Sequence, residues 1–260
     1  MGKFDGILLV SDLDGTLCDQ GKVSSQNSQA IRYFQSEGGL FSIASGRQPN
    51  WLLQWKNDFI PNTWSSMLNG AIICDANGEN FVFEQPVDSD IVELTQTIRS
   101  ACPKLEWVMF CGCNEHSAPI LQNAQIDPTV LPSTIYKCLV RVPDEFSDEY
   151  TETVRRILSP NYICMRSWIN GIEYQKVGTG KGDSILRLKK LLGKAARLTV
   201  AVGNYENDCD MIKAADIGYA VGDAIPSAKA CANRITVPCA EHAIAKIIDD
   251  LERLDASRLR

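Results

Sequence analysis

Short apolar runs alternate with amphipathic stretches at both ends of the chain. Residues 4–11 and 40–44 are mostly apolar, and each run leads into a polar loop, which is typical of buried parallel strands. Between them, residues 24–38 carry an apolar stripe at helical spacing, with serines at the start and two glycines at the end. A strand, a helix and a strand in this order predict one right-handed parallel unit.

The C-terminal part of the chain repeats this arrangement. We expect helices over 181–192, 208–215, 224–232 and from about 241 onward, separated by strands over 198–202, 217–221 and 234–237. Both ends of the chain therefore predict the two halves of one doubly wound, Rossmann-like α/β sheet with parallel strands. Such sheets bind ligands at the carboxyl ends of their strands, so polar residues that follow a predicted strand are the candidates for chemistry.

The middle of the chain has a different pattern. Strand-like composition is found over 107–113, 137–142 and 162–174, and helical stretches over 91–102 and 146–158. We therefore expect a core made of residues 1–78 and 178–260, with residues 79–177 forming an inserted α+β cap domain.

Composition narrows the class of protein. The chain has 260 residues, and its 26 Lys and Arg against 32 Asp and Glu give a net charge of −6, the wrong sign for a nucleic-acid binder. No apolar run is long enough for a membrane helix, and the acidic residues near the start do not fit a secretory segment. Ten cysteines in this context predict reduced thiols and a cytoplasmic protein, either a monomer or a small homo-oligomer.

Polar residues follow the first two predicted strands. Asp12 and Asp14 lie two residues apart in Asp-Leu-Asp-Gly-Thr, and such a pair can hold a hard cation while one carboxylate attacks or moves protons. The second strand ends at Ser45, Gly46 and Arg47, where a hydroxyl, backbone N–H groups and a guanidinium can form an anion seat. Taken alone, either segment is also compatible with an ordinary polar turn.

Two further polar segments precede predicted helices. Residues 178–182 lack the full pattern of a nucleotide-binding phosphate loop, so Lys181 is interpreted as a single cation near a helix start. Asn204, Asn207 and Asp208 offer oxygen ligands to Mg²⁺, although Asp208 would equally fit a helix cap. Because all four polar segments fall at strand ends or helix starts of one predicted sheet, we expect them to share one site.

The order and spacing of these segments resemble the haloacid dehalogenase-like (HAD) hydrolases over the whole chain, specifically the Cof-type phosphatases with an inserted C2-type cap. The Asp-x-Asp-Gly-Thr segment after an apolar strand is the most specific part of the resemblance. The resemblance implies that Asp12 attacks phosphorus and forms an aspartyl phosphate, and that Asp14 protonates the leaving alcohol and then activates water. It further implies phosphate-binding residues Ser45, Gly46, Arg47, Asn69, Lys181 and Asn207, and Mg²⁺ ligands Asp12, Asp14, Asn204 and Asp208.

One residue departs from the family pattern. The fourth segment usually begins Gly-Asp, whereas here it begins Gly203–Asn204, so a neutral amide replaces a carboxylate ligand. The resemblance implies a Mg²⁺-dependent phosphatase that acts on a small phosphorylated metabolite such as a sugar phosphate. Two alternatives stay open: a phosphomutase that uses the same Asp12 chemistry, and a weakly active phosphometabolite sensor, which the Asn204 exchange motivates. A nicotinamide-dependent oxidoreductase does not fit, because acids stand where a glycine-rich turn would bind pyrophosphate.

Two other groups of residues are less specific. Cys111, Cys113 and His116 are close in sequence, but they lack a fourth zinc ligand and lie in a strand-like stretch, so buried thiols are expected. The three tryptophans within residues 51–64 are compatible with core packing, with inter-domain packing or with a substrate wall.

Overall fold

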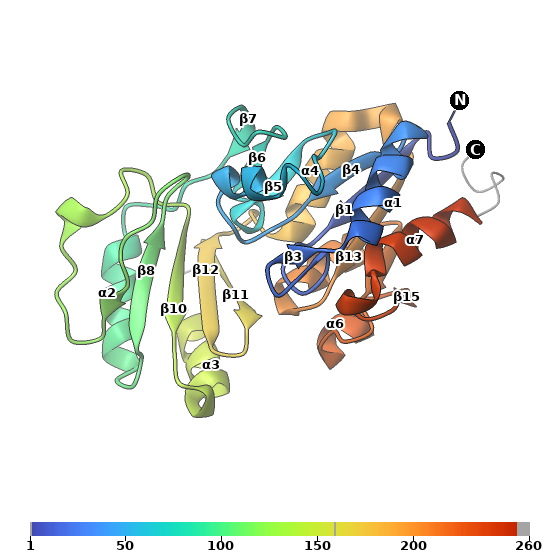
Figure 1. The fold of residues 1–260 in the computed structure, drawn as a ribbon. Coiled ribbons are helices and arrows are strands. Elements are labelled where there is room, and N and C mark those ends of the chain that lie inside the picture. Colours follow the sequence, from blue (N-terminus) through green and yellow to red (C-terminus); the bar gives the residue numbers. More distant parts are fainter. Residues whose placement is uncertain (1, 159, 254–260) are drawn as a thin grey trace.

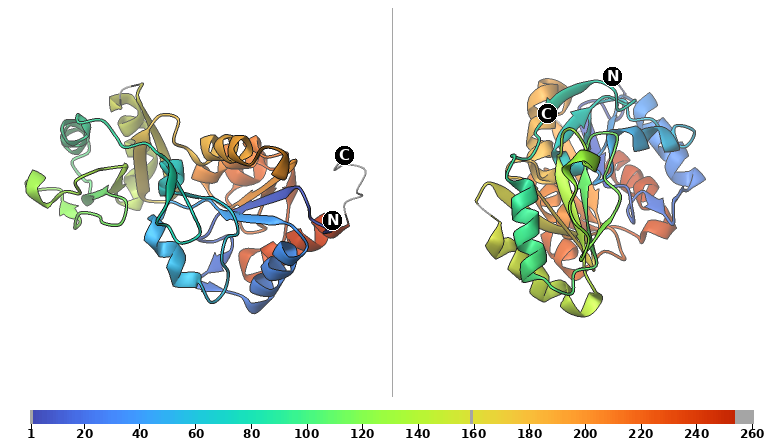
Figure 2. Two further views of the ribbon diagram at one scale, coloured as in Figure 1. Left: turned by 90° about the horizontal axis from the view of Figure 1, so that it is seen from above. Right: turned by 90° about the vertical axis from the view of Figure 1, so that its left-hand side faces the viewer.

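Two five-stranded β-sheets organise the computed structural model, which describes residues 2–158 and 160–253. Both ends of the chain build the larger body around the first sheet, and the middle of the chain builds the smaller body around the second sheet (Figure 1). Near the two ends of the described chain, Lys3 Nζ lies 2.5 Å from Glu252 Oε1, and both residues lie on the larger body, on the side away from the smaller one (Figure 2).

The first sheet is parallel, and β1 lies inside it between β13 and β4. In spatial order its strands are β15 (Arg234–Ile235), β14 (Ile217–Ala220), β13 (Leu198–Gly203), β1 (Ile7–Ser11) and β4 (Leu40–Ile43). Every residue of β1 is buried, because neighbouring strands flank it and side chains pack against both of its faces. A strand buried on both faces needs a continuous apolar run, and this is the pattern seen in the sequence.

Helices cover both faces of this sheet. They are α1 (Ser25–Ser36), α4 (Lys181–Leu192), α5 (Cys209–Ala214), α6 (Pro226–Cys231) and α7 (Ala243–Glu252). Leu9 packs in one core with residues of α1, α6 and α7, whereas Leu8 and Val10 pack in the other core with residues of α4 and α5. The predicted α/β fold with a central parallel sheet is therefore confirmed.

Some predicted boundaries differ from those in the structure. The first helix begins at Ser25 because the Ser24 hydroxyl accepts the backbone N–H of Asn27 at 3.1 Å as an N-cap. The helix predicted over 224–232 is shorter, since Pro226 is its first residue and lacks the N–H that an earlier turn would need. The run 162–174 resolves into a hairpin of two antiparallel strands.

The second sheet is antiparallel and has the order β11-β12-β10-β8-β9. Its strands are β8 (Trp107–Cys111), β9 (Ile120–Leu121), β10 (Lys137–Arg141), β11 (Tyr162–Trp168) and β12 (Gly171–Lys176), and its helices are α2 (Ile91–Ala101) and α3 (Ser147–Ile157). Alternate strand residues such as Phe110, Cys138 and Tyr174 form an apolar core with both helices. The intervening residues of these strands are free to face the larger body.

A three-stranded sheet lies where the chain leaves the larger body. It consists of β5 (Ser65–Met67), β6 (Ile72–Cys74) and β7 (Phe81–Glu84), and the smaller β2 (Cys18–Asp19) and β3 (Lys22–Val23) form a separate hairpin. β7 pairs with β6, so residues 81–84 of the predicted insertion pair with a strand of the larger body. The chain crosses between Gln85, whose N–H donates to the Ala71 carbonyl, and Val87, whose N–H donates to the Ile135 carbonyl.

All ten cysteines are free thiols in the structure, as composition predicted. Within residues 2–158 and 160–253, no helix combines the length and the apolar character needed to cross a lipid bilayer.

The packing of the smaller body yields a stability prediction. Phe110→Ala removes a fully buried ring from the core beneath α2 and α3, and we expect it to lower the free energy of unfolding by about 3–5 kcal/mol. Urea unfolding followed by circular dichroism measures the change. Leu121→Ala on the neighbouring strand β9 is the matched control, because Leu121 is 63% exposed and its loss should change stability by less than about 0.5 kcal/mol. Equal losses in the two variants would contradict the assigned packing.

Candidate active site

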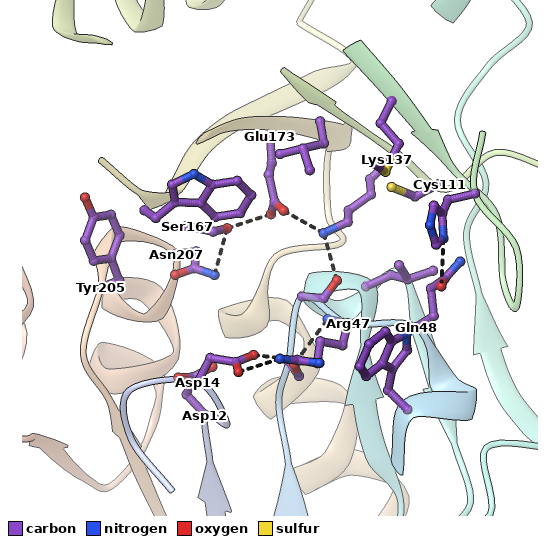
Figure 3. Close-up of a pocket in the computed structure, with 18 of the residues that line it drawn as sticks. Asp12, Asp14, Arg47, Gln48, Cys111, Lys137, Ser167, Glu173, Tyr205 and Asn207 are labelled. Atoms are coloured by element: carbon purple, nitrogen blue, oxygen red, sulfur yellow. Dashed lines mark hydrogen bonds and ion pairs between the residues drawn. The ribbon is translucent and has the colours of Figure 1, made fainter. Parts of the chain in front are cut away.

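A cavity of about 670 Å³ lies between the two bodies, at the carboxyl ends of β1, β4 and β13 (Figure 3). Of the predicted site residues, seven line it: Asp12, Asp14, Ser45, Gly46, Arg47, Asn204 and Asn207. Three others, Lys181, Asp208 and Asn69, are fully or almost fully buried just beneath its surface. The tertiary structure thus brings all ten predicted residues to one region.

Three of these side chains form a buried ion cluster under the cavity. The Lys181 Nζ atom lies 2.6 Å from Asp12 Oδ1 and 2.6 Å from Asp208 Oδ1. Burial lowers the pKa of the Lys181 ammonium, but the two carboxylates outweigh burial and raise it. Burial and the charge of Asp208 raise the pKa of the Asp12 carboxyl, and the Lys181 charge only partly opposes them. The shared ammonium is therefore what allows two carboxylates to lie close together out of water.

Asp208 also holds the loop that follows β13. Its Oδ2 atom accepts the backbone N–H groups of Asn204 at 2.8 Å and of Tyr205 at 3.0 Å. A side chain on Gly203 is not tolerated, since its Cβ would lie 2.4 Å from the Asp208 Cβ. Asp208, which sequence reasoning offered as a Mg²⁺ ligand, thus sits behind the loop while Asn204 faces the cavity.

Asn204 reaches across to the turn that carries Asp14. Gly15 has a φ of +78°, and a Cβ at this position would lie 2.4 Å from Asn204 Nδ2. The amide group therefore lies against the Asp14–Gly15 turn, and both Asp12 and Asn204 line the cavity. In the part of the chain that the structure describes, no three His, Cys, Asp or Glu side chains come together as a metal-binding group. Asp12 offers carboxylate oxygens, Asn204 offers an amide oxygen, and the adjacent backbone offers carbonyl oxygens. A set made only of oxygens fits Mg²⁺. It carries one negative charge fewer than a set with two carboxylates.

The loop after β4 carries the predicted anion seat. Ser45 is buried, and its Oγ accepts the backbone N–H of Arg47 at 3.1 Å. The Arg47 guanidinium donates two hydrogen bonds to the Asp14 carboxylate, at 2.7 and 2.8 Å, and lies over the rings of Trp51 and Trp55. Of these tryptophans only Trp51 lines the cavity, because Trp55 is buried in the core. The third one, at position 64, packs at the edge of a core.

Sequence reasoning missed an ion pair that the cap contributes to the cavity. Lys137 on β10 and Glu173 on β12 are both buried, and Lys137 Nζ lies 2.7 Å from Glu173 Oε1. The same Nζ donates to the Gly46 carbonyl at 2.7 Å, so the cap touches the anion seat directly. Burial would raise the pKa of the Glu173 carboxyl, but the Lys137 charge and three hydrogen bonds outweigh burial and lower it. A charged residue inside an apolar strand-like run was the available signal.

Glu173 connects this pair to two predicted site residues. Asn69 donates its amide N–H to Glu173, and its Oδ1 accepts Asn207 Nδ2 at 3.2 Å. Ser167 Oγ donates to Glu173 at 2.7 Å and lies 3.2 Å from the same Asn207 nitrogen (Figure 3). Asn69, predicted as a phosphate or substrate contact, is thus fully buried and links the cap to Asn207.

The cysteine and histidine segment forms another part of the cavity wall. Cys111 and His116 line the cavity, and His116 Nδ1 lies 3.3 Å from Gln48 Oε1. The Gln48 amide also donates to the Gly112 and Glu115 carbonyls at 3.0 and 2.6 Å. These residues join the cap to the loop after β4.

Comparison with known proteins adds the family context. A sequence profile of the haloacid dehalogenase-like hydrolases matches residues 9–102 and 111–248. The phosphatase YwpJ of Bacillus subtilis is 26% identical, over 94% of this chain and 99% of its own. The 5-amino-6-(5-phospho-D-ribitylamino)uracil phosphatase YcsE of the same organism is 24% identical, over 93% and 94%. The structure of the HAD subclass IIB sugar phosphatase BT4131 has the same fold, with a TM-score of 0.78 at 19% identity, over 94% of this chain and 98% of that one.

The buried cap pair predicts a pH dependence of stability. Glu173→Gln leaves the Lys137 ammonium without its counter-ion, and we expect a loss of about 3–5 kcal/mol at pH 7. Because the folded pKa of Glu173 is lowered, its contribution is complete above the ordinary value of 4.5 and is lost as pH falls through the folded value. The difference between wild type and variant should therefore shrink below pH 4.5, as measured by urea unfolding.

Glu106→Gln is the matched control for this experiment. Glu106 forms an exposed pair with Arg141 on the same sheet, at 3.6 Å, and removing its charge should cost less than about 1 kcal/mol at any pH. A Glu173→Gln deficit that stays constant down to pH 3 would show that the ion pair is not its source.

Proposed function

The chain belongs to the haloacid dehalogenase-like hydrolases, and we propose that it is a Mg²⁺-dependent phosphatase that hydrolyses a small phosphomonoester, such as a sugar phosphate, through an aspartyl phosphate. Its similarity to phosphatases that act on phosphorylated metabolites supports this class of substrate. We further propose that it acts in the cytoplasm, and that the cap is the inserted segment 79–177 without β7, the remaining residues being the catalytic core.

One observation carries this proposal. Asp12 stands at the end of β1 with its carboxylate in the cavity, and the buried Lys181 ammonium lies 2.6 Å from it. A carboxylate and a phosphate repel each other, so attack requires positive charge next to both. Lys181 supplies such a charge at a fixed position, and the Arg47 guanidinium supplies a second one at the cavity surface.

In the proposed reaction Asp12 is the nucleophile. A carboxylate oxygen of Asp12 forms a bond to phosphorus while the bond from phosphorus to the ester oxygen breaks, and Asp14 gives a proton to the leaving alcohol. Asp14 then takes a proton from water, whose oxygen attacks phosphorus and releases inorganic phosphate and free Asp12. Arg47, which donates two hydrogen bonds to Asp14, would orient that carboxylate at the cavity mouth.

Asp12, Asn204 and the backbone carbonyl of Asp14 are the residues that would hold Mg²⁺. When bound, the cation supplies positive charge that offsets the phosphate and the attacking carboxylate. Ser45, with the backbone around Gly46, would bind the phosphoryl oxygens, and the cap would exclude bulk water from the cavity.

Phosphate release from a panel of phosphorylated metabolites tests the proposal. The purified protein should release inorganic phosphate from at least one small ester, and EDTA should abolish the release. Asp12→Asn keeps the shape of the side chain but removes the nucleophile, and we expect a loss of at least about a thousandfold in kcat. Circular dichroism of the variant checks that the fold is retained.

Three outcomes would contradict the proposal. Full turnover by Asp12→Asn would show that Asp12 is not the nucleophile. Exchange between isomeric sugar phosphates without free phosphate would indicate a mutase. Ligand binding without any turnover would indicate a sensor.

The neutral amide of Asn204 predicts that a carboxylate at this position would let the protein work at a lower Mg²⁺ concentration. Asn204→Asp restores a negative charge beside Asp12, and ligand charge strengthens binding of a divalent cation. We expect the Mg²⁺ concentration for half-maximal activity to fall about tenfold, as measured by titrating Mg²⁺ in the phosphate-release assay. Asn80→Asp is the control, since Asn80 is exposed, contacts Asp75 and does not line the cavity. An unchanged Mg²⁺ requirement in Asn204→Asp would place the cation elsewhere.

A further inference from the structure

The cap presents one charged group to the cavity whose hydrogen bonds are not all used. The Lys137 ammonium has three N–H donors. One bonds to Glu173 and one to the Gly46 carbonyl, both at 2.7 Å. Across residues 2–158 and 160–253 no third acceptor for this ammonium is found, and Lys137 lines the cavity. One charge-assisted donor therefore remains for a ligand.

The environment of Lys137 holds that donor in place. The side chain is 5% exposed, and the carboxylate that neutralises it is fixed by Ser167 and Asn69. The Glu173 carboxylate accepts three hydrogen bonds, one of them from Lys137. It is therefore a rigid counter-ion for Lys137, unlike the flexible partner in a surface ion pair. A donor with so little freedom selects for an acceptor at one position.

The position of Lys137 indicates which part of the substrate it meets. The core loops already provide Lys181, Arg47 and the anion seat for the phosphoryl group. Lys137 lies on the opposite wall, on the cap sheet, where its neighbours on the same face of the sheet are Leu139 and Met109. Its second hydrogen bond ends on the Gly46 carbonyl, which belongs to the anion seat, so the free donor lies beside the phosphate position and its acceptor belongs near the ester bond.

We propose that Lys137, held by Glu173, is a specificity-determining residue that donates a hydrogen bond to a hydroxyl oxygen of the alcohol part of the substrate. This inference rests on the proposed phosphatase function and narrows it to phosphate esters of polyhydroxylated alcohols, namely sugar or alditol phosphates. Simple alkyl phosphates lack the acceptor, and they would leave a buried donor unpaired.

The test compares two substrates that differ in hydroxyl groups. Ribose 5-phosphate carries hydroxyls near the ester, and propyl phosphate carries none. The wild-type protein should have the higher kcat/KM for ribose 5-phosphate. The double variant Lys137→Met/Glu173→Gln removes both charges together, so no buried charge is left unpaired. We expect it to lose about ten- to a hundredfold in kcat/KM on ribose 5-phosphate and less than about threefold on propyl phosphate.

Two further variants make the result interpretable. Arg141→Met/Glu106→Gln removes an exposed pair from the same sheet and should leave both rates unchanged. Lys137→Arg keeps the charge but displaces the donor, and it should lower the ribose 5-phosphate to propyl phosphate ratio severalfold even if the double variant folds poorly.

The outcomes separate this inference from the proposed function. Equal losses on both substrates would mean that the pair supports the phosphate seat, and would overturn the specificity role. Equal wild-type kcat/KM values for the two substrates, or an unchanged ratio in both Lys137 variants, would overturn it as well. Failure of the phosphatase proposal has a different signature, because the wild-type protein would then release phosphate from neither substrate, or Asp12→Asn would leave turnover of every substrate intact.

Discussion

The buried ammonium of Lys181 is the constraint on which the rest of the site depends. It lies 2.6 Å from both Asp12 and Asp208, and without it two carboxylates would share a nearly water-free volume with no compensating charge. The first residue of α4 thereby links the end of β1 to the loop after β13. Chemistry and stability are coupled here, because the charge that suits attack on a phosphate also permits the acids to be buried.

Close backbone approach follows from that constraint. For Asp208 to reach Lys181 and still accept two backbone N–H groups, the loop after β13 must fold tightly over it, and Gly203 leaves the room. On the opposite side, Gly15 adopts a positive φ and lets the Asn204 amide lie against the Asp14 turn. Glycines at these two positions thus bring oxygen donors from separate loops within one small volume.

Several contacts between the cap and the core are polar. Lys137 bonds to the Gly46 carbonyl, Gln48 to carbonyls of the cap, and Glu206 forms ion pairs with Arg155 and Arg166. Polar interfaces of this kind exchange their partners for water at modest cost, and relative domain motion is expected for them. The cap has its own apolar core beneath α2 and α3, and it meets the larger body through hydrogen bonds and ion pairs together with a small apolar contact at Cys111 and Tyr136. Such a limited interface suits a body that admits and releases a ligand.

The sequence by itself determined the parallel sheet and the positions of its polar loops. A strand buried on both faces needs an unbroken apolar run, and strand ends and helix starts are marked by local residues such as Ser24 and Gly203. Because parallel strands share one carboxyl edge, local patterns were enough to gather Asp12, Ser45 and the residues near 204 into one region.

Only the tertiary structure decided which cap residues face that region and which predicted ligands are buried behind it. Successive side chains of a strand point to opposite faces of the sheet, but the sequence does not say which face another body will cover. The charges at Lys137 and Glu173 stand out within apolar runs, yet the sequence alone does not say whether they face solvent or a cavity. Likewise, Asn69 and Asp208 turned out to hold loops beneath the cavity surface, because their hydrogen bonds reach residues that are distant in sequence or on the far side of a tight loop. Long-range pairing of buried polar groups is a property of the assembled fold and leaves no local pattern.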